Sequence, residues 1–525
     1  MLLTDQGIKD FKDEYLNKGY SLPLYDREAV INVTKTSPEW IHFGAGNIFR
    51  AFQGNLMQRL LNEGLTSSGL IVCEGYDYEI IDKMYKPHDN LSILATLKAD
   101  GTADKLVVAS IVESLILNRD SVSDFARLKE IFTSDLLKMV SFTITEKGYV
   151  VCDNMGNPLQ PVMADIKAGP DKTMSYIGKI ASLLYERYRS GAKPIAMVSM
   201  DNCSHNGDKL KDAILCFAKG WQENGADDGG FYRYCTDTSK VSFPWSMIDK
   251  ITPRPDDMIK AMLEGDGIEG LEPVITSKNT YVAPFVNAEE TEYLVIEDSF
   301  PNGRIPLDKV GVIYTDRETV DKVEKMKVCT CLNPLHTALA IFGCLLGYTT
   351  IHDEMEDEDL RSLVYKLGHE EGMKTVVDPG VLSPSEFLDN VLTKRLPNPF
   401  MPDTPQRIAC DTSQKIPIRF GETVKAYRAR QDLSTEDLTL IPLVLAGYLR
   451  YLKGIDDEGK AFELSPDPML DTLRELKPSE VLAYTEVFGN DLFADSLGER
   501  ILKIYEELDA GPGSVRKVLH KTVNA

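Results

Sequence analysis

The chain has 525 residues, of which 43% are hydrophobic and 26% charged, a composition typical of a globular protein with two or three domains. The formal net charge of -23 argues against nucleic acid or an anionic membrane as a partner, because both repel an acidic surface. The nine cysteines form no paired framework and the N-terminal residues lack a signal-peptide apolar core, so we expect a cytoplasmic protein. The oligomeric state stays open between a monomer and a small homo-oligomer.

The first half of the chain alternates strands and helices, as a parallel α/β domain does. Residues 91–97 and 105–114, on either side of a turn-rich segment, predict a hairpin added to the sheet. We therefore expect an α/β domain over residues 1–290. Apolar runs predict buried strands at 40–44, 70–74, 139–145 and 194–200. Helical periodicity predicts helices at 47–64, 173–191 and 208–221.

Helical patterns dominate after about residue 290, which predicts a mostly α-helical second domain over residues 291–525. Ser383 followed by Pro384 is a helix-start signature. The acidic run at 353–360 predicts a solvent-facing helix start, where carboxylates are favoured. The apolar run at 438–452 is too short to span a bilayer and contains a proline and an arginine, so we interpret it as a buried helix.

A glycine turn separates the first predicted strand from the helix that follows it. Gly44 and Gly46 lie in this turn, where glycines let the backbone approach a pyrophosphate placed on the helix N-terminus. Phe49 occupies the position at which the dinucleotide-binding pattern has glycine or alanine, so the helix must pack differently from the usual case. The alternative interpretation is a glycine turn that binds no nucleotide.

Three further residues complete the candidate cofactor site. Glu74 ends the second predicted strand, where a carboxylate accepts hydrogen bonds from an adenosine ribose and repels a 2′-phosphate, so NAD is favoured over NADP. Asn47 and Arg50 lie in the first helical turn after the glycines. Arg50 either contacts a phosphate or lies along the helix surface.

A second candidate site is the segment from Lys327 to His336. Asn333 is suited to cap a helix and Pro334 to occupy its first position, so His336 should lie in the first turn. Lys327 would approach this helix N-terminus, which favours negative charge, and a desolvated lysine there can act as a general acid or base. The alternative is a simple helix cap, a packed histidine and a solvated lysine.

Cys329 and Cys331 lie beside this segment. They lack a convincing third and fourth ligand, so we predict no zinc and no other metal. If the segment before the helix is extended, both sulfurs lie on one face and pack there.

Seven motifs in order along the chain resemble those of the polyol-specific long-chain dehydrogenases, whose members include mannitol 2-dehydrogenases, fructuronate reductases and tagaturonate reductases. The resemblance implies a Rossmann-type N-terminal domain with added strands, a mostly α-helical C-terminal domain and an active site between them. The motifs are GAGNIFRAF, TITEKGY at 143–149, SMDN at 199–202, SMIDKITP at 246–253, VIEDSFPNGR at 295–304, K-x5-N-x2-H at 327–336 and SQKIPIR at 413–419.

The resemblance also implies catalytic roles. Lys327 would transfer the proton, and the amides of Asn202 and Asn333 would stabilise the alkoxide. His336 would bind and orient the substrate. Glu146 matches a glutamate associated with proton passage to solvent.

Basic residues bear on the substrate. A sugar acid needs a cation for its carboxylate, ideally a bidentate arginine. Lys415, Arg419 and Lys147 resemble the basic residues of fructuronate reductases more than those of mannitol dehydrogenases, although exposed basic residues are also common on protein surfaces. Asp249 and Arg407 match substrate-contacting positions of the family.

We therefore expect an NAD-dependent oxidoreductase that reduces D-fructuronate to D-mannonate by metal-free hydride transfer. Mannitol 2-dehydrogenase and tagaturonate reductase are the alternatives within the family, so the partner is a small sugar acid or polyol. A methyltransferase or a non-catalytic nucleotide-binding protein with the same glycine turn is the alternative of another class.

Overall fold

The computed structural model describes residues 1–525, which form two compact units. Unit 1 comprises Met1–Leu97 and Thr102–Asp321, and unit 2 comprises Lys98–Gly101 and Lys322–Ala525. The boundary expected at residue 290 falls inside unit 1, because strand β14 (Tyr293–Glu297) pairs with β10 (Ser246–Asp249) on one side and with β15 (Ile313–Thr315) on the other. The helical part of the chain therefore begins later than its sequence pattern indicates.

A parallel six-stranded sheet is the centre of unit 1. Its strand order is β6-β3-β2-β7-β8-β9, which in chain order is 3-2-1-4-5-6, the order of dinucleotide-binding sheets. The four buried strands expected from apolar runs are confirmed. The strands are β2 (Trp40–Phe43), β3 (Leu70–Glu74), β6 (Ile111–Ile116), β7 (Met139–Phe142), β8 (Ile195–Ser199) and β9 (Val241–Ser242).

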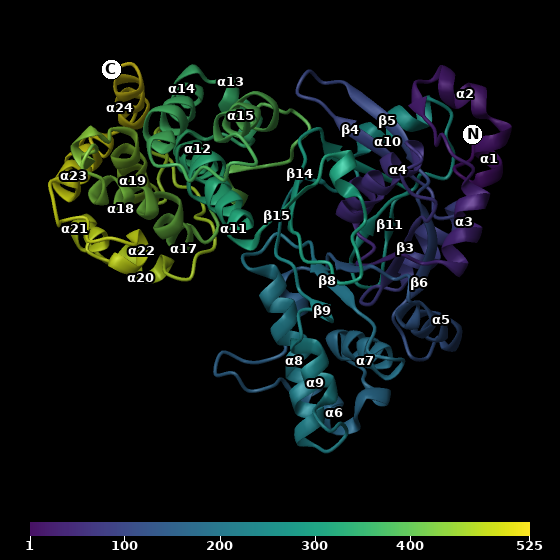
Figure 1. Ribbon diagram of the computed structural model, residues 1–525. Helices are drawn as coiled ribbons and strands as arrows, with labels where there is room; N and C mark the ends of the chain where they lie inside the picture. The colour runs from purple at the N-terminus through teal and green to yellow at the C-terminus, as the bar shows by residue number, and fades with distance from the viewer. The chain divides into compact units, whose positions relative to one another are not determined.

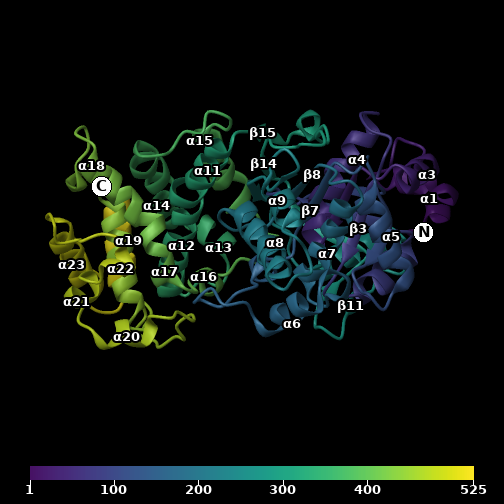
Figure 2. The same cartoon turned by 60° about the horizontal axis from the view of Figure 1, so that its bottom comes forward.

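Helices cover both faces of this sheet (Figure 1). Because side chains alternate along a strand, Ile41 and Phe43 of β2 join one buried cluster and Trp40 joins the other. Figure 2 shows α7 (Tyr176–Arg189) and α8 (Asn206–Glu223) packed side by side on the sheet. The helices of unit 1 are α1 (Asp5–Asp10), α2 (Lys12–Asn17), α3 (Arg27–Thr36), α4 (Gly54–Asn62), α5 (Val122–Thr133), α6 (Gln160–Ala168), α7 (Tyr176–Arg189), α8 (Asn206–Glu223), α9 (Gly230–Thr236) and α10 (Asp257–Gly265).

The expected hairpin forms, but not as part of the parallel sheet. Strands β4 (Ser92–Leu97) and β5 (Ala103–Val108) pair antiparallel within a separate sheet of order β1-β5-β4-β13. Strand β5 ends before Ser110, whose hydroxyl donates to Gly54 O at 2.6 Å. Only the next strand, β6, belongs to the parallel sheet. The remaining strands are β1 (Tyr20–Ser21), β11 (Val274–Ile275), β12 (Tyr281–Val282) and β13 (Phe285–Glu289).

Unit 2 is helical and is organised around α12 (Asn333–Leu346), which packs against α14 (Glu358–Lys366), α16 (Pro405–Ile408) and α19 (Leu440–Tyr451). The continuous helical run 317–346 is long and apolar enough to cross a membrane, but 78% of its most apolar window is buried in the protein, as in a core helix. Helix α11 (Arg317–Met326) contains the boundary between the units. The other helices of unit 2 are α13 (Ile351–Glu356), α14 (Glu358–Lys366), α15 (Pro384–Asn390), α16 (Pro405–Ile408), α17 (Thr412–Ile416), α18 (Glu422–Ala429), α19 (Leu440–Tyr451), α20 (Leu470–Glu475), α21 (Pro478–Leu482), α22 (Thr485–Phe488), α23 (Leu497–Leu508) and α24 (Ser514–Val523).

Two of the three local predictions for unit 2 are confirmed and one is wrong in part. Ser383 caps α15, because its hydroxyl accepts from Glu386 N, and the apolar run around α19 is buried, as expected. The acidic run at 353–360 is not wholly solvated: Glu354 is 0% exposed. Burial raises the pKa of Glu354 well above its usual value, which favours the neutral form of this carboxyl group.

Candidate functional site

The glycine turn lies at the carboxyl end of β2. Gly44 has φ +115°, and a Cβ there would collide with the carbonyl oxygen of Thr143, so only glycine fits. At Gly46 a Cβ would meet no atom within 4 Å, so open space lies over the start of the next helix, which begins at Asn47. The backbone can therefore come close to a pyrophosphate lying on that helix N-terminus, and the turn fits a dinucleotide.

The helix after the turn departs from the usual dinucleotide-binding pattern, as Phe49 predicts. Its first turns are π-helical over Phe49–Gln53 (η1). Phe49 is fully buried and stacks on His42, with ring centroids 4.5 Å apart. Close packing occurs instead at Gly54, whose hypothetical Cβ would lie 3.2 Å from Val108 Cγ1 of β5, in the four-stranded sheet.

Arg50 does not lie along the helix surface, so that alternative is wrong. Its side chain is fully buried and donates to Ala283 O at 2.6 Å, to Ser92 Oγ at 3.1 Å and to Asn47 Oδ1 at 2.8 Å. Burial lowers the pKa of Arg50 to about 10. In this arrangement Arg50 holds Asn47 in the first helical turn.

Glu74 ends β3 beside the glycine turn. Its Oε2 accepts from Ala45 N at 2.9 Å, and its Oε1 accepts from the backbone N–H groups of Gly75, Tyr76 and Asp77 at 3.0, 2.8 and 3.2 Å. The carboxylate thus ties the turn after β3 to the turn after β2. It occupies the position at which a ribose-binding carboxylate is found in dinucleotide-binding folds.

Asn202 lies in an exposed bend after β8. Its neighbour Asp201, 9% exposed, accepts hydrogen bonds from Ile144 N at 3.0 Å, Thr145 N at 2.8 Å and Tyr149 OH at 2.5 Å. These bonds join the SMDN motif to the TITEKGY motif. Sequence reasoning missed Asp201; its place directly before Asn202 was the available signal.

The segment that Asp201 holds is strained. Thr145 has φ +64° and ψ 158°, a region adopted almost only by glycine and costing about 1–3 kcal/mol for other residues. Glu146 follows it at the start of a short 3₁₀ turn, Glu146–Tyr149 (η4), and pairs with Lys209 at 3.0 Å. Glu146 and Lys147 are exposed, which suits contact with solvent or a small ligand.

Asp249 is the last residue of β10 and is 6% exposed. Its backbone pairs with Tyr293 of β14. The neighbouring Lys250 donates to Glu289 O at 2.7 Å and pairs with Glu292 at 3.0 Å. Asp249 is thus fixed by the small sheet that extends unit 1 beyond residue 290.

In unit 2, Lys327 begins a π-helical turn, Lys327–Cys331 (η7), between α11 and α12, and is 4% exposed. Asn333 is not the helix cap: Leu332, with φ -129°, precedes the first helical residue and no side chain caps the helix. The predicted cap fails because the chain is already helical before Leu332. π-Helical turns are frequent at functional sites, and η7 packs against α12.

The two cysteines near Lys327 are not on one face of an extended segment, because that segment is the π-helical turn. Cys331 is buried, which raises its pKa to about 12, whereas Cys329 is partly exposed. No group of three or more His, Cys, Asp or Glu side chains gathers where it could hold a metal ion. All nine cysteines are free thiols.

His336, in the first turn of α12 as expected, is 12% exposed. Burial lowers its pKa to about 4, and Arg395, Arg419 and Arg407 lower it further while Asp403 opposes them. The imidazole is therefore neutral at pH 7, able to donate one hydrogen bond and accept another. Asp403 Oδ2 lies 3.9 Å from His336 Nε2.

Arg419 lies in the turn Pro417–Gly421 (η11), and its Nη1 donates to Thr337 Oγ1 at 2.6 Å and to Asn333 O at 3.4 Å. It has no carboxylate partner within 4.0 Å, and its Nε and Nη2 make no hydrogen bond. Desolvation lowers its pKa to about 10. The guanidinium thus presents an open edge of two donors next to Asn333, which matches a carboxylate.

The other basic candidates differ from Arg419. Lys415 donates to the carbonyl oxygens of Ile408, at 3.1 Å, and Cys410, and desolvation lowers its pKa. Arg407 is 61% exposed and pairs with Asp403. Arg395 is 2% exposed, and its positive charge lowers the pKa of His336. No motif in the sequence pointed to Arg395.

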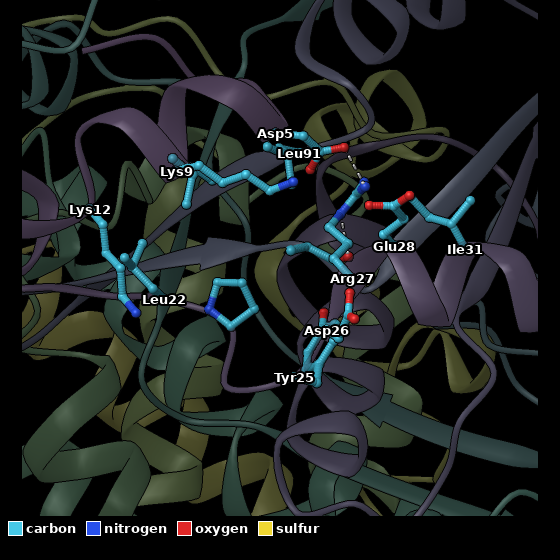
Figure 3. Close-up of a pocket in the computed structure, with 13 residues that line it drawn as sticks. Asp5, Lys9, Lys12, Leu22, Tyr25, Asp26, Arg27, Glu28, Ile31 and Leu91 are labelled. Atoms are coloured by element: carbon cyan, nitrogen blue, oxygen red, sulfur yellow. Dashed lines mark hydrogen bonds and ion pairs between the residues drawn. The ribbon is translucent and has the colours of Figure 1, made fainter.

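A cavity of about 360 Å³ lies elsewhere in unit 1 (Figure 3). It is lined partly by Ala109, just before β6, and so lies near the amino ends of the parallel strands, whereas the glycine turn follows their carboxyl ends. Its Arg27 is already engaged by Asp5 at 2.9 Å and by Ala109 O and Ile111 O, both at 3.0 Å. Parallel sheets bind ligands at the carboxyl ends of their strands, so this cavity is not the candidate site.

Comparisons with known proteins agree with this architecture. The profile of the mannitol dehydrogenase Rossmann domain matches residues 38–309, and that of the mannitol dehydrogenase C-terminal domain matches residues 319–509. The chain is 50% identical to D-mannonate oxidoreductase of Thermotoga maritima over 100% of this chain and 99% of that one. It is 30% identical to mannitol 2-dehydrogenase of Pyrenophora tritici-repentis over 90% of this chain and 79% of that one.

Solved structures give the same result. A D-sorbitol dehydrogenase in substrate-free form matches with TM-score 0.80 and 25% identity over 95% of this chain and 97% of that chain. Mannitol 2-dehydrogenase of Pseudomonas fluorescens, in a ternary complex with NAD and D-mannitol, matches with TM-score 0.71 and 26% identity over 100% of both chains. The chain therefore belongs to the mannitol dehydrogenase family of oxidoreductases.

Proposed function

We propose that this protein is an NAD-dependent reductase of a ketose acid and that its substrate is D-fructuronate, which it reduces to D-mannonate. Unit 1 binds the cofactor, and unit 2 supplies the arginine that recognises the carboxylate of the sugar acid. The D-mannonate oxidoreductase that shares 50% identity with this chain supports the product assignment. The glycine turn and Glu74 support NAD as the cofactor.

The single observation that carries the substrate class is Arg419. A partly buried guanidinium without a counter-ion is costly, and a carboxylate that meets its free Nε and Nη2 would remove that cost. D-Fructuronate has a carboxylate where D-fructose has a hydroxymethyl group. An uncompensated arginine beside Asn333 and His336 therefore favours a sugar acid over a polyol.

The chain's own residues perform the proton chemistry. NAD supplies the hydride when it is bound in reduced form. The Lys327 ammonium donates a proton to the oxygen of the substrate ketone as that oxygen gains negative charge. The side-chain amides of Asn202 and Asn333 donate hydrogen bonds to this oxygen. Each bond contributes about 3 kcal/mol to transition-state stabilisation.

The remaining assignments complete the cycle. The neutral imidazole of His336 orients a substrate hydroxyl, since it can both donate and accept. Exposed Glu146 returns a proton from solvent to the site. Asp249, Arg407 and Lys415 contact the sugar. We place the enzyme in the cytoplasm, without nucleic acid or membrane as a partner.

Parallel steady-state assays with NADH and three ketoses test the substrate assignment. D-Fructuronate should give the highest kcat/KM, followed at a distance by D-tagaturonate and D-fructose. Mannitol 2-dehydrogenase activity is the second candidate, because relatives of that name cover 90% of this chain. The highest kcat/KM with D-fructose would select that alternative and reject the sugar acid.

A further inference from the structure

We propose that Asp201 is a positioning residue that fixes Asn202 and Glu146 relative to each other, and this inference rests on the proposed function. Its carboxylate accepts three hydrogen bonds from the 144–149 segment. Asp201 itself is adjacent to Asn202 in the chain. One side chain therefore ties the bend that carries the alkoxide-binding amide to the segment that carries the proton-passing glutamate.

The bend around Asp201 is itself anchored from the other side. Asn206, fully buried at the start of α8, donates to Asp201 O at 3.0 Å and to Ser246 O at 2.9 Å, and its Oδ1 accepts from Ser246 N at 3.0 Å. Tyr149 reinforces the contact, because its hydroxyl also lies 2.8 Å from Ser199 Oγ. The carboxylate is thus held by fixed groups and cannot follow a displaced 144–149 segment.

The backbone of that segment needs this support. Thr145 has φ +64°. The Asp201 carboxylate accepts hydrogen bonds from the backbone N–H groups of Thr145 and of the preceding Ile144. A strained conformation persists only where its surroundings determine it. Without the carboxylate the segment relaxes, and Glu146 and Asn202 lose their fixed separation.

Asp201→Asn is the test, because an amide cannot accept from both backbone N–H groups with both of its heavy atoms. Asp165→Asn is a matched control. Asp165 is 4% exposed and accepts from Met174 N at 2.7 Å, Ser175 N at 2.8 Å and Ser175 Oγ at 2.5 Å, so it makes the same kind of clamp between α6 and α7, away from the candidate site.

We expect Asp201→Asn to lower kcat for D-fructuronate by about 10²-fold, the usual effect of a misplacement of about 1 Å, with the KM for D-fructuronate and the Kd for NADH nearly unchanged. Asp165→Asn should lower Tm by about as much as Asp201→Asn does, but it should leave kcat nearly unchanged. Tyr149→Phe, which keeps both backbone bonds, should give an intermediate loss of kcat and serves if Asp201→Asn does not fold. Equal losses of kcat in the Asp201 and Asp165 variants would overturn the inference while the proposed function stood.

Amide hydrogen exchange separates the clamp from the reaction. Residues 143–149 should exchange faster in Asp201→Asn than in the wild type, and at the wild-type rate in Asp165→Asn. Unchanged exchange at 143–149 in Asp201→Asn overturns the inference. A wild-type enzyme that turns over none of the three ketoses contradicts the proposed function instead, and this exchange measurement still decides whether the clamp exists.

Discussion

The substitution Arg419→Gln tests the carboxylate assignment most sharply. Glutamine removes the charge and the open Nε–Nη2 edge. Its side chain is also two bonds shorter, so it gives up the contact of Nη1 with Thr337 Oγ1 at 2.6 Å, a loss that is the same for every substrate. Hydrogen bonds to charged groups contribute about 1.5–3 kcal/mol each. The contributions of the two hydrogen bonds from Nε and Nη2 to the carboxylate are not fully additive. Losing both should therefore cost about 3 kcal/mol, or about 150-fold in kcat/KM.

The assay compares two substrates in each variant. With NADH, kcat/KM for D-fructuronate should fall by about 150-fold in Arg419→Gln, whereas kcat/KM for D-fructose, which has no carboxylate, should change by less than about threefold. Arg419→Lys should keep part of the activity, because it retains the charge but loses the planar fork. Arg428→Gln is the matched control: Arg428 is paired at 2.9 Å with Asp495, in the bend before α23, and its loss should not change the preference between the substrates.

An equal fall for both substrates in Arg419→Gln would refute this reasoning. Arg419 would then serve only to hold the N-terminal turn of α12, where it donates to Asn333 O at 3.4 Å. A fall for neither substrate would show that the carboxylate binds elsewhere. In either case the preference for a sugar acid would need a different cation.

Three further predictions concern cofactor, pH and metal. Glu74→Ala should weaken NADH binding about tenfold and narrow the preference over NADPH, measured by titration calorimetry; an unchanged preference would remove Glu74 from ribose recognition. His336 has a pKa of about 4 in the fold against 6.5 when exposed, so unfolding takes up a proton as pH falls through this window and the wild type loses stability. His336→Gln should therefore gain about 2 kcal/mol relative to wild type between pH 7 and pH 5 in urea unfolding; a constant difference would show that the imidazole is not kept neutral. Dialysis against a chelator should leave kcat unchanged, because no ligand cluster gathers; loss of kcat restored by a divalent cation would contradict the metal-free mechanism.

The parallel sheet could be predicted from the sequence because its signals are local. Short apolar runs bounded by turns predicted β2, β3, β7 and β8, and the glycine turn, with Glu74 ending the second strand, predicted NAD as the cofactor. The hairpin was harder, since residues 106–112 are apolar except for Ser110 and contain no glycine or proline that would mark a turn. Only tertiary pairing divides them between β5 in one sheet and β6 in another.

The candidate site required information that spacing does not contain. Asn333 has the residue type of a cap, but the π-helical turn from Lys327 makes the chain helical before it. The absence of a counter-ion at Arg419 emerges only when the fold brings it to Thr337, 82 positions earlier in the chain. Asp201 likewise meets Ile144 across 57 positions, so its positioning role could not be read from the motif.

The kcat of Lys327→Ala with D-fructuronate and NADH tests the central claim most directly, because the account gives the proton transfer to this one side chain. We predict a fall of about 10²–10⁴-fold, the usual contribution of a general acid, with NADH binding unchanged and partial recovery on addition of methylamine. Lys425→Ala, which removes an exposed lysine paired with Glu422 in unit 2, should behave as wild type. A Lys327→Ala enzyme that keeps kcat within about threefold of wild type would contradict the account, since a general acid contributes far more.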